Sequence, residues 1–148
     1  SRGREHVRDA HRTRAVHRGE SERARSEFMR AIRADDVAAL TQLFTQDAVL
    51  RSDGGGKAIA AINPIVGPGR IARFVAGVVR KYRDALHSRA VTVNGEPGFI
   101  ISIRGVLVQA LALEIDAGHI SAVYVMRNPD KLHAIAERYG LITEDQVG

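Results

Sequence analysis

The chain has 148 residues, of which 45% are hydrophobic and 26% charged, and it contains no cysteine. This length and composition indicate a single folded domain and exclude a disulfide framework, a thiolate metal site and a cysteine nucleophile. The apolar runs are shorter than the roughly 18 residues that a membrane span needs, and no apolar stretch resembles a secretion signal. We therefore expect a soluble, cytoplasmic domain, and the start at Ser1 leads us to expect a fragment of a longer chain.

The net charge of +5 comes entirely from one end of the chain. The first 33 residues hold ten arginines and five acids, whereas the other 115 hold twelve basic and twelve acidic side chains. A helical linker whose arginines face water would explain the basic segment, and so would a segment that contacts phosphates or an acidic partner. The balanced remainder argues against a nucleic-acid-binding body, because it has no excess charge to attract a polyanion.

The first elements predicted along the chain are helical. Residues 1–20 have almost no large apolar side chains, so a helix there would have no apolar stripe to bury. From Phe28 to Phe44 the apolar residues follow helical spacing, with a break at Asp35–Asp36 where a helix N-cap is expected. A strand is then expected from Asp47, and it ends where three consecutive glycines disfavour regular structure.

A short apolar strand or turn is expected over residues 57–66, before the clearest helix of the sequence. Ile71, Val75 and Val78 belong to an apolar stripe with helical spacing, and Pro68 suits a first helical turn. This helix is expected to run from about residue 68 to 86, with His87 placed to cap its C-terminus.

The apolar period then changes to two, which is typical of strands. Short glycine-bearing turns join these strands. Because turns of this length can connect only antiparallel neighbours, the strands are expected to form an antiparallel meander. A final helix is expected to begin at Asn128-Pro129-Asp130 and to end at Gly140. The expected strands are Ala90–Val93, Phe99–Ile103, Val106–Ile115 and Ile120–Arg127.

Helices followed by a curved, mostly antiparallel sheet give an α+β fold class. A sheet wrapped around a long helix forms a cone, and the open end of a cone can hold a small ligand. No pair of titratable groups stands out as a general acid and base, and Glu114 is expected to point away from the core. No set of histidines and acids has metal-ligand spacing, so neither catalysis nor a cofactor is predicted.

Two charged segments are candidate contact sites. The first comprises Asp53, Gly54, Gly55, Gly56 and Lys57; it lacks the glycine spacing and the hydroxyl residue of a phosphate-binding P-loop. It is either a flexible bend or a backbone that approaches a partner closely. The second comprises Asn128, Pro129, Asp130, Lys131 and Leu132; it is either a turn in which Asp130 caps the last helix or part of a surface patch shared with the first segment.

The chain resembles a broad superfamily and, more specifically, one group of proteins that carry a domain of that superfamily. Residues 26–132 resemble the SnoaL-like branch of the nuclear-transport-factor-2-like superfamily, and residues 28–40, 43–44 and 47–50 are similar to its first helices and strand. Residues 52–57, 93–98 and 127–132 together resemble the SigJ-type extracytoplasmic-function sigma factors, which carry a SnoaL-like domain behind sigma regions 2 and 4. Residues 1–7 look like the end of sigma region 4.

The resemblance implies a basic linker over 1–20, a SnoaL-like cone over 21–140 and a tail over 141–148. It also implies a domain that regulates its own sigma factor through residues 53–57 and 128–132. The implied partners are sigma regions 2 and 4 of the same chain and the RNA polymerase core, with DNA bound only through the sigma regions.

Two other functions remain open. One is a SnoaL-like polyketide cyclase, ketosteroid isomerase or small-ligand sensor, with an apolar pocket lined by Phe74, Val78, Tyr82 and Tyr124. The histidine and aspartate that the SnoaL cyclases use inside the cone cannot both be placed in this sequence. The other is a dimeric binding module, because sheets in this superfamily often pair.

Overall fold

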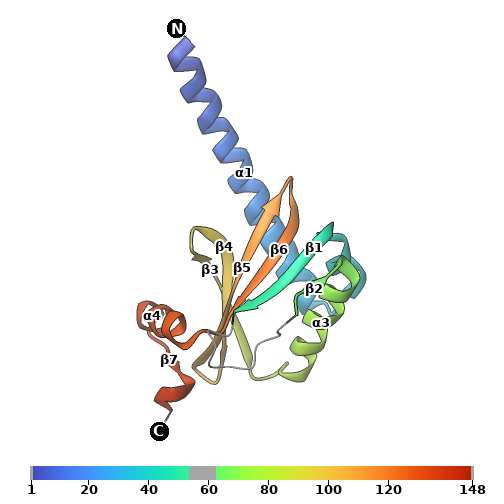
Figure 1. Cartoon of the computed structure of the whole chain (residues 1–148), viewed down its shortest axis with the longest axis vertical. Helices are drawn as coiled ribbons and strands as arrows, with labels where there is room; N and C mark the ends of the chain where they lie inside the picture. The colour runs from blue at the N-terminus through green and yellow to red at the C-terminus, as the bar shows by residue number, and fades with distance from the viewer. Residues whose placement is uncertain (1, 54–62, 148) are drawn as a thin grey trace.

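The computed structural model describes residues 2–53 and 63–147, and within these ranges the side chains from residue 17 onward. The helices and strands mix in the order that the sequence predicts, which confirms the α+β class (Figure 1). The helices are α1 (Arg2–Arg33), α2 (Val37–Gln42), α3 (Pro68–Lys81), α4 (Pro129–Tyr139) and the 3₁₀ helix η1 (Glu144–Gln146). The strands are β1 (Phe44–Asp53), β2 (Ile65–Val66), β3 (Leu86–Val93), β4 (Glu96–Ile103), β5 (Val106–Asp116), β6 (His119–Met126) and β7 (Ile142–Thr143).

Helix α1 is continuous, and its N-terminal part projects beyond the sheet (Figure 1). Its C-terminal part is anchored by Ala24, Phe28 and Ala31, each at most 3% exposed. Asp36 caps α2 as predicted, because its side chain accepts a hydrogen bond from the Ala39 amide at 3.0 Å. No helix among the described residues is both long enough and apolar enough to cross a membrane.

The sheet has the strand order β2-β1-β6-β5-β4-β3. Strands β3 to β6 form the predicted antiparallel meander. Each of its three hairpin turns, at residues 94–95, 104–105 and 117–118, has two residues with positive φ. Two-residue turns of this kind match the right-handed twist of the strands that they join. Strand β1 differs, because it pairs with β6 in parallel.

The sheet has an inner face that packs on α1, α2 and α3, and an outer face partly covered by α4. On the inner face the rings of Phe28 and Phe99 stack with centroids 5.8 Å apart. On the outer face Ala110, Ala112 and Met126 pack against buried residues of α4. Because both faces carry apolar residues, the sheet separates two cores.

Four predicted boundaries are wrong by three residues or more, and in each case strand pairing decides the outcome. Strand β1 begins at Phe44 rather than Asp47, because the carbonyl of Leu43 already accepts from the Ile120 amide at 2.8 Å. Helix α3 ends at Lys81 rather than near residue 86. Strand β3 begins at Leu86 and pairs along its whole length with β4, so His87 lies in a strand and does not cap α3. Strand β4 begins at Glu96 rather than Phe99, because Glu96 already pairs with Val93 of β3.

The last residues complete the sheet. Strand β5 begins at Val106, but its pairing with β6 covers only residues 110–116, so the start of β5 has an edge that β6 does not reach. Strand β7 pairs in parallel with Val106 and Leu107 at that edge. A covered edge cannot pair with another chain. Ile142 and Thr143, which belong to the segment expected to be a tail, provide this cover.

Gly98 provides a test of the packing between β4 and β5. A Cβ atom at this position would lie 2.1 Å from the carbonyl oxygen of Leu111. We expect Gly98→Ala to lower the free energy of unfolding by about 1–3 kcal/mol, because the two backbones would have to separate. Chemical denaturation measures this loss.

The matched control is Gly77→Ala on α3, where an added Cβ meets nothing within 4 Å. This variant should gain about 0.5–1 kcal/mol, because alanine favours a helix interior over glycine. Equal stabilities for the two variants would contradict the close approach at Gly98.

Candidate functional site

The two predicted contact segments begin side by side, at the ends of neighbouring strands. In the parallel pair, Asp53 at the end of β1 is in register with Met126 at the end of β6. The Arg127 amide donates to the Asp53 carbonyl at 2.9 Å. The Lys131 ammonium lies 2.9 Å from a carboxylate oxygen of Asp53, across 78 positions of sequence. An ion pair thus joins the two segments.

Of the first segment, the structure describes Asp53 alone. Gly54, Gly55, Gly56 and Lys57 lie outside the described residues. The Asp53 side chain is 41% exposed and that of Lys131 is 52% exposed, so the pair is accessible to a partner. We name Asp53 together with Asn128–Leu132 the strand-end surface.

The second segment forms the N-terminus of α4, but the capping residue is not the predicted one. Asn128, rather than Asp130, is the N-cap, and its side-chain oxygen accepts from the Asp130 amide at 3.0 Å. The β conformation of Asn128 and the fixed φ of Pro129 at the first helical position place that amide within reach. Asp130 and Lys131 are exposed, whereas Leu132 is 6% exposed and packs in the outer-face core.

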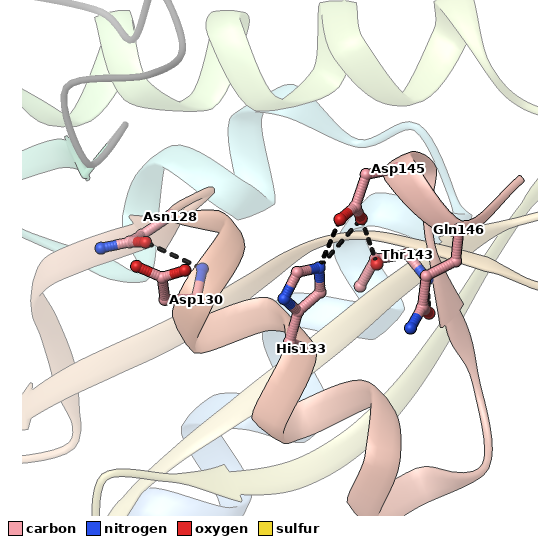
Figure 2. A network of polar contacts seen from close by, with 6 residues as sticks. All are labelled: Asn128, Asp130, His133, Thr143, Asp145 and Gln146. Atoms are coloured by element: carbon pink, nitrogen blue, oxygen red, sulfur yellow. Dashed lines mark hydrogen bonds and ion pairs between the residues drawn. The ribbon is translucent and has the colours of Figure 1, made fainter.

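The C-terminal residues brace this helix from the side (Figure 2). The Asp145 carboxylate lies 2.7 Å from His133 Nε2 and accepts a hydrogen bond from the hydroxyl of Thr143, a buried residue. The Thr143 amide donates to the Gln146 side chain at 3.0 Å. The hydrogen bonds from Thr143 and then from His133 lower the pKa of Asp145. The network therefore ties η1 to the helix that carries the strand-end surface.

A cavity of about 360 Å³ lies between the inner face of the sheet, α1 and α3. Phe74, Val78 and Tyr82 line it, as the sequence predicts. Tyr124 does not, and this part of the prediction is wrong. In β6 the side chains of Val123 and Val125 belong to the inner core, so Tyr124 between them points to the outer face.

Tyr124 instead forms a polar contact on the outer face. Its hydroxyl donates to a carboxylate oxygen of Glu114 at 2.9 Å, and this hydrogen bond, followed by burial, raises the pKa of Tyr124. Glu114 is exposed and points away from the core, in agreement with the expected alternation. The strand period in the sequence contained the signal that excludes Tyr124 from the cavity.

Sequence reasoning missed the polar side chains that line the same cavity. They are Ser52, Lys81, Ser88, Gln109, Arg127 and Glu144. Ser52 directly precedes Asp53, the last residue of β1, and Arg127 directly follows Met126, the last residue of β6. These two cavity residues therefore adjoin the strand-end surface in sequence. Only the parallel pairing of β1 with β6 places them together.

The described lining of the cavity holds few groups that act as a general acid or base. Among the described residues that line the cavity, Glu144 is the one carboxylate and there is no histidine. The described residues contain no group of three histidines or acids that could hold a metal ion. A second, more open hollow of about 450 Å³ lies where β1 and β6 begin, at the other end of this strand pair, beside His119.

No family model matches the chain. A curated relative, the ECF RNA polymerase sigma factor SigJ of Mycobacterium tuberculosis, is 27% identical over an alignment of 113 residues that covers 70% of this chain and 36% of that protein. The chain therefore spans little more than a third of the curated relative that it matches. The crystal structure of SigJ superposes with a TM-score of 0.63 at 24% identity, covering 88% of this chain and 50% of that chain.

Two further solved structures have a similar fold. A steroid delta-isomerase from Pseudomonas aeruginosa has a TM-score of 0.54 at 23% identity and covers 82% of this chain and 89% of its own. A SnoaL-like protein of unknown function from Burkholderia thailandensis has a TM-score of 0.53 at 13% identity, with 72% and 92% covered. The comparisons confirm the predicted SnoaL-like fold and the resemblance to SigJ.

The ion pair between Lys131 and Asp53 is exposed, so it should add little to stability. We expect Lys131→Ala to change the free energy of unfolding by less than about 1 kcal/mol, because solvent screens the charges. Urea denaturation measures this change. A loss above about 2 kcal/mol would mean that the pair holds the fold together and is not simply a surface feature.

The brace around Asp145 should depend on pH. Because the pKa of Asp145 is lowered by folding, the carboxylate contributes stability above the unfolded value near 4 and loses it as the pH falls through the folded value. The difference in unfolding free energy between the wild type and Asp145→Asn should therefore shrink between about pH 5 and pH 3.

Denaturation curves across this pH range measure the difference. Asp116→Asn is the control, since Asp116 is an exposed acid at the β5–β6 turn. This variant removes an acid that takes no part in the brace, so the effect specific to Asp145 is the change with pH that Asp116→Asn does not share. An Asp145→Asn difference that is equally large at both ends of the range contradicts the role of the carboxylate.

Proposed function

We propose that this SnoaL-like domain of the SigJ type is a cis-acting regulatory domain of an extracytoplasmic-function sigma factor. The proposal rests on the similarity to SigJ in sequence and in fold. The single observation that carries it is the ion pair between Asp53 and Lys131, because it joins the two segments whose residues resemble the signatures of these factors. The domain would act on transcription initiation in the cytoplasm.

The strand-end surface would be the contact with sigma regions 2 and 4 or the linker between them. It offers an exposed acid, Asp130, next to the half-exposed ion pair, so both signs of charge are available to a partner. Paired charges at the rim of an interface set orientation and specificity more than affinity. Gly54–Lys57 would extend this contact, and the RNA polymerase core would be met through the sigma regions.

Helix α1 would link the domain to sigma region 4. Residues 1–20 would be the basic linker and residues 21–140 the domain. The 32 residues of α1 form one helix, which spans about 48 Å at 1.5 Å per residue. Because its C-terminal part is buried against the sheet, the direction of the helix is fixed by the domain core. The domain would therefore position region 4 as well as contact it, and DNA would be bound only through the sigma regions.

A second candidate function is that of a SnoaL-like enzyme or small-ligand-binding module. The fold shared with the steroid delta-isomerase and the cavity under α3 favour this reading. Chemistry of the cyclase or isomerase kind needs a positioned acid–base pair. The described cavity lining supplies one carboxylate and no histidine, so the cavity favours binding over turnover.

The test is a titration of this chain with sigma regions 2 and 4 supplied as a separate polypeptide, at several salt concentrations. We expect saturable binding that weakens with salt, and a loss of about tenfold or more on Asp53→Ala or Asp130→Ala, since truncating an interfacial charge costs about 2 kcal/mol or more. Calorimetry or fluorescence anisotropy measures the affinity.

Asp116→Ala is the matched control, because it removes an exposed acid at the far end of β5. It should leave the affinity unchanged. The absence of binding at concentrations above those that a tether supplies, which are in the millimolar range, would contradict the proposal.

A further inference from the structure

The cavity beneath α3 has an apolar body. Phe99 and Leu111 line it from the inner face of the sheet and Phe28 lines it from α1. Phe74 on α3 and Tyr82, the C-cap of α3, line the opposite side. Phe74 is 44% exposed and Tyr82 is 39% exposed, although both carry large apolar rings. A volume of about 360 Å³ falls within the range of about 300–1,000 Å³ that is typical of small-molecule sites. The walls therefore fit an apolar molecule of modest size.

The cavity also has polar lining residues, and the described ones carry a net positive charge. Lys81 and Arg127 contribute cations, and Glu144 contributes the one acid among the described lining residues. Within the described part of the chain, neither cation forms an ion pair. Nor do the Ser52 hydroxyl and the Gln109 amide, both also on the lining, have hydrogen-bond partners there.

These groups share one chemical preference. A guanidinium, an ammonium, a hydroxyl and an amide can all donate hydrogen bonds to an oxyanion, and a guanidinium matches a carboxylate with two parallel bonds. Glu144 disfavours a second negative charge on the ligand, because like charges in one site repel. The polar lining therefore fits a single carboxylate better than a phosphate or a dicarboxylate.

We propose that this cavity binds an amphipathic monocarboxylate, with its apolar body between α3 and the inner face of the sheet and its head group on Arg127. Ser52 and Arg127 directly adjoin Asp53 and Asn128 in sequence, so the head group would sit next to the strand-end surface. The binding itself does not depend on any contact with the sigma regions, so it can be tested on this chain alone.

The experiment titrates the full chain with decanoate and with decanol, which has the same apolar chain and no charge. Isothermal titration calorimetry should show saturable binding of decanoate, and decanol should bind about tenfold or more weakly. Arg127→Gln should lower the affinity for decanoate by about tenfold and leave that for decanol unchanged, because charge-assisted hydrogen bonds are lost.

Arg51→Gln is the matched control. Arg51 directly precedes Ser52 in β1, is exposed and does not line the cavity, so the variant removes the same charge outside the site. Its affinity for decanoate should equal that of the wild type. Val78→Phe, which fills the cavity from a half-buried position on α3, should weaken both ligands. Its thermal unfolding curve checks that it folds.

Three results would overturn the proposal. One is no saturable binding of decanoate below its micelle concentration. The second is equal affinity for decanoate and decanol, which removes the head-group site. The third is an equal loss with Arg127→Gln and Arg51→Gln, which leaves only a general effect of charge. None of these results bears on the titration with the sigma regions, so the two proposals fail separately.

Discussion

The parallel pairing of β1 with β6 is the constraint on which the strand-end surface depends. Parallel neighbours end at the same edge of a sheet, so residues that follow the two strands emerge together. Here Asp53 and Met126 are in register, and the Arg127 amide bonds to the Asp53 carbonyl at 2.9 Å. The ion pair of Asp53 with Lys131 is a consequence of this register, and so is the presence of Ser52 and Arg127 on one cavity.

The two faces of the sheet differ in how closely their helices pack. On the outer face, α4 packs closely on small residues such as Ala110 and Ala112, and this core fixes the helix that carries Asn128–Leu132. On the inner face, larger residues meet α1 and α3, and a cavity of about 360 Å³ is left between them. A rigid helix and an open cavity thus adjoin the same strand ends.

Both ends of the chain reinforce this arrangement. The C-terminal part of α1 is buried against the inner face, so the projecting part of the helix has a direction set by the core (Figure 1). At the other end, β7 occupies the edge of β5, and Asp145 holds His133 on α4 (Figure 2). The strand-end surface is therefore supported through the last residues of the chain as well as through the sheet.

Features that depend only on neighbouring residues could be predicted from the sequence. The period of Ile71, Val75 and Val78 predicts α3, and glycine-bearing turns predict the meander, because helix stripes and two-residue turns are local patterns. The three segments that resemble SigJ-type factors could also be identified from the sequence, and the α+β class could be predicted from it. Predictions from local patterns were wrong where the position of a residue depends on a partner far away in the sequence.

Which distant side chains come into contact depends on the fold of the whole chain. No pattern near Asp53 in the sequence predicts its ion pair with Lys131, which lies 78 positions away. Strand β1 starts at Phe44, and Ser52, Arg127 and Glu144 line one cavity, because of pairings that close long loops. Such contacts form because both faces of one sheet are buried at once by segments that lie far apart in the sequence. A short stretch of residues therefore does not predict them.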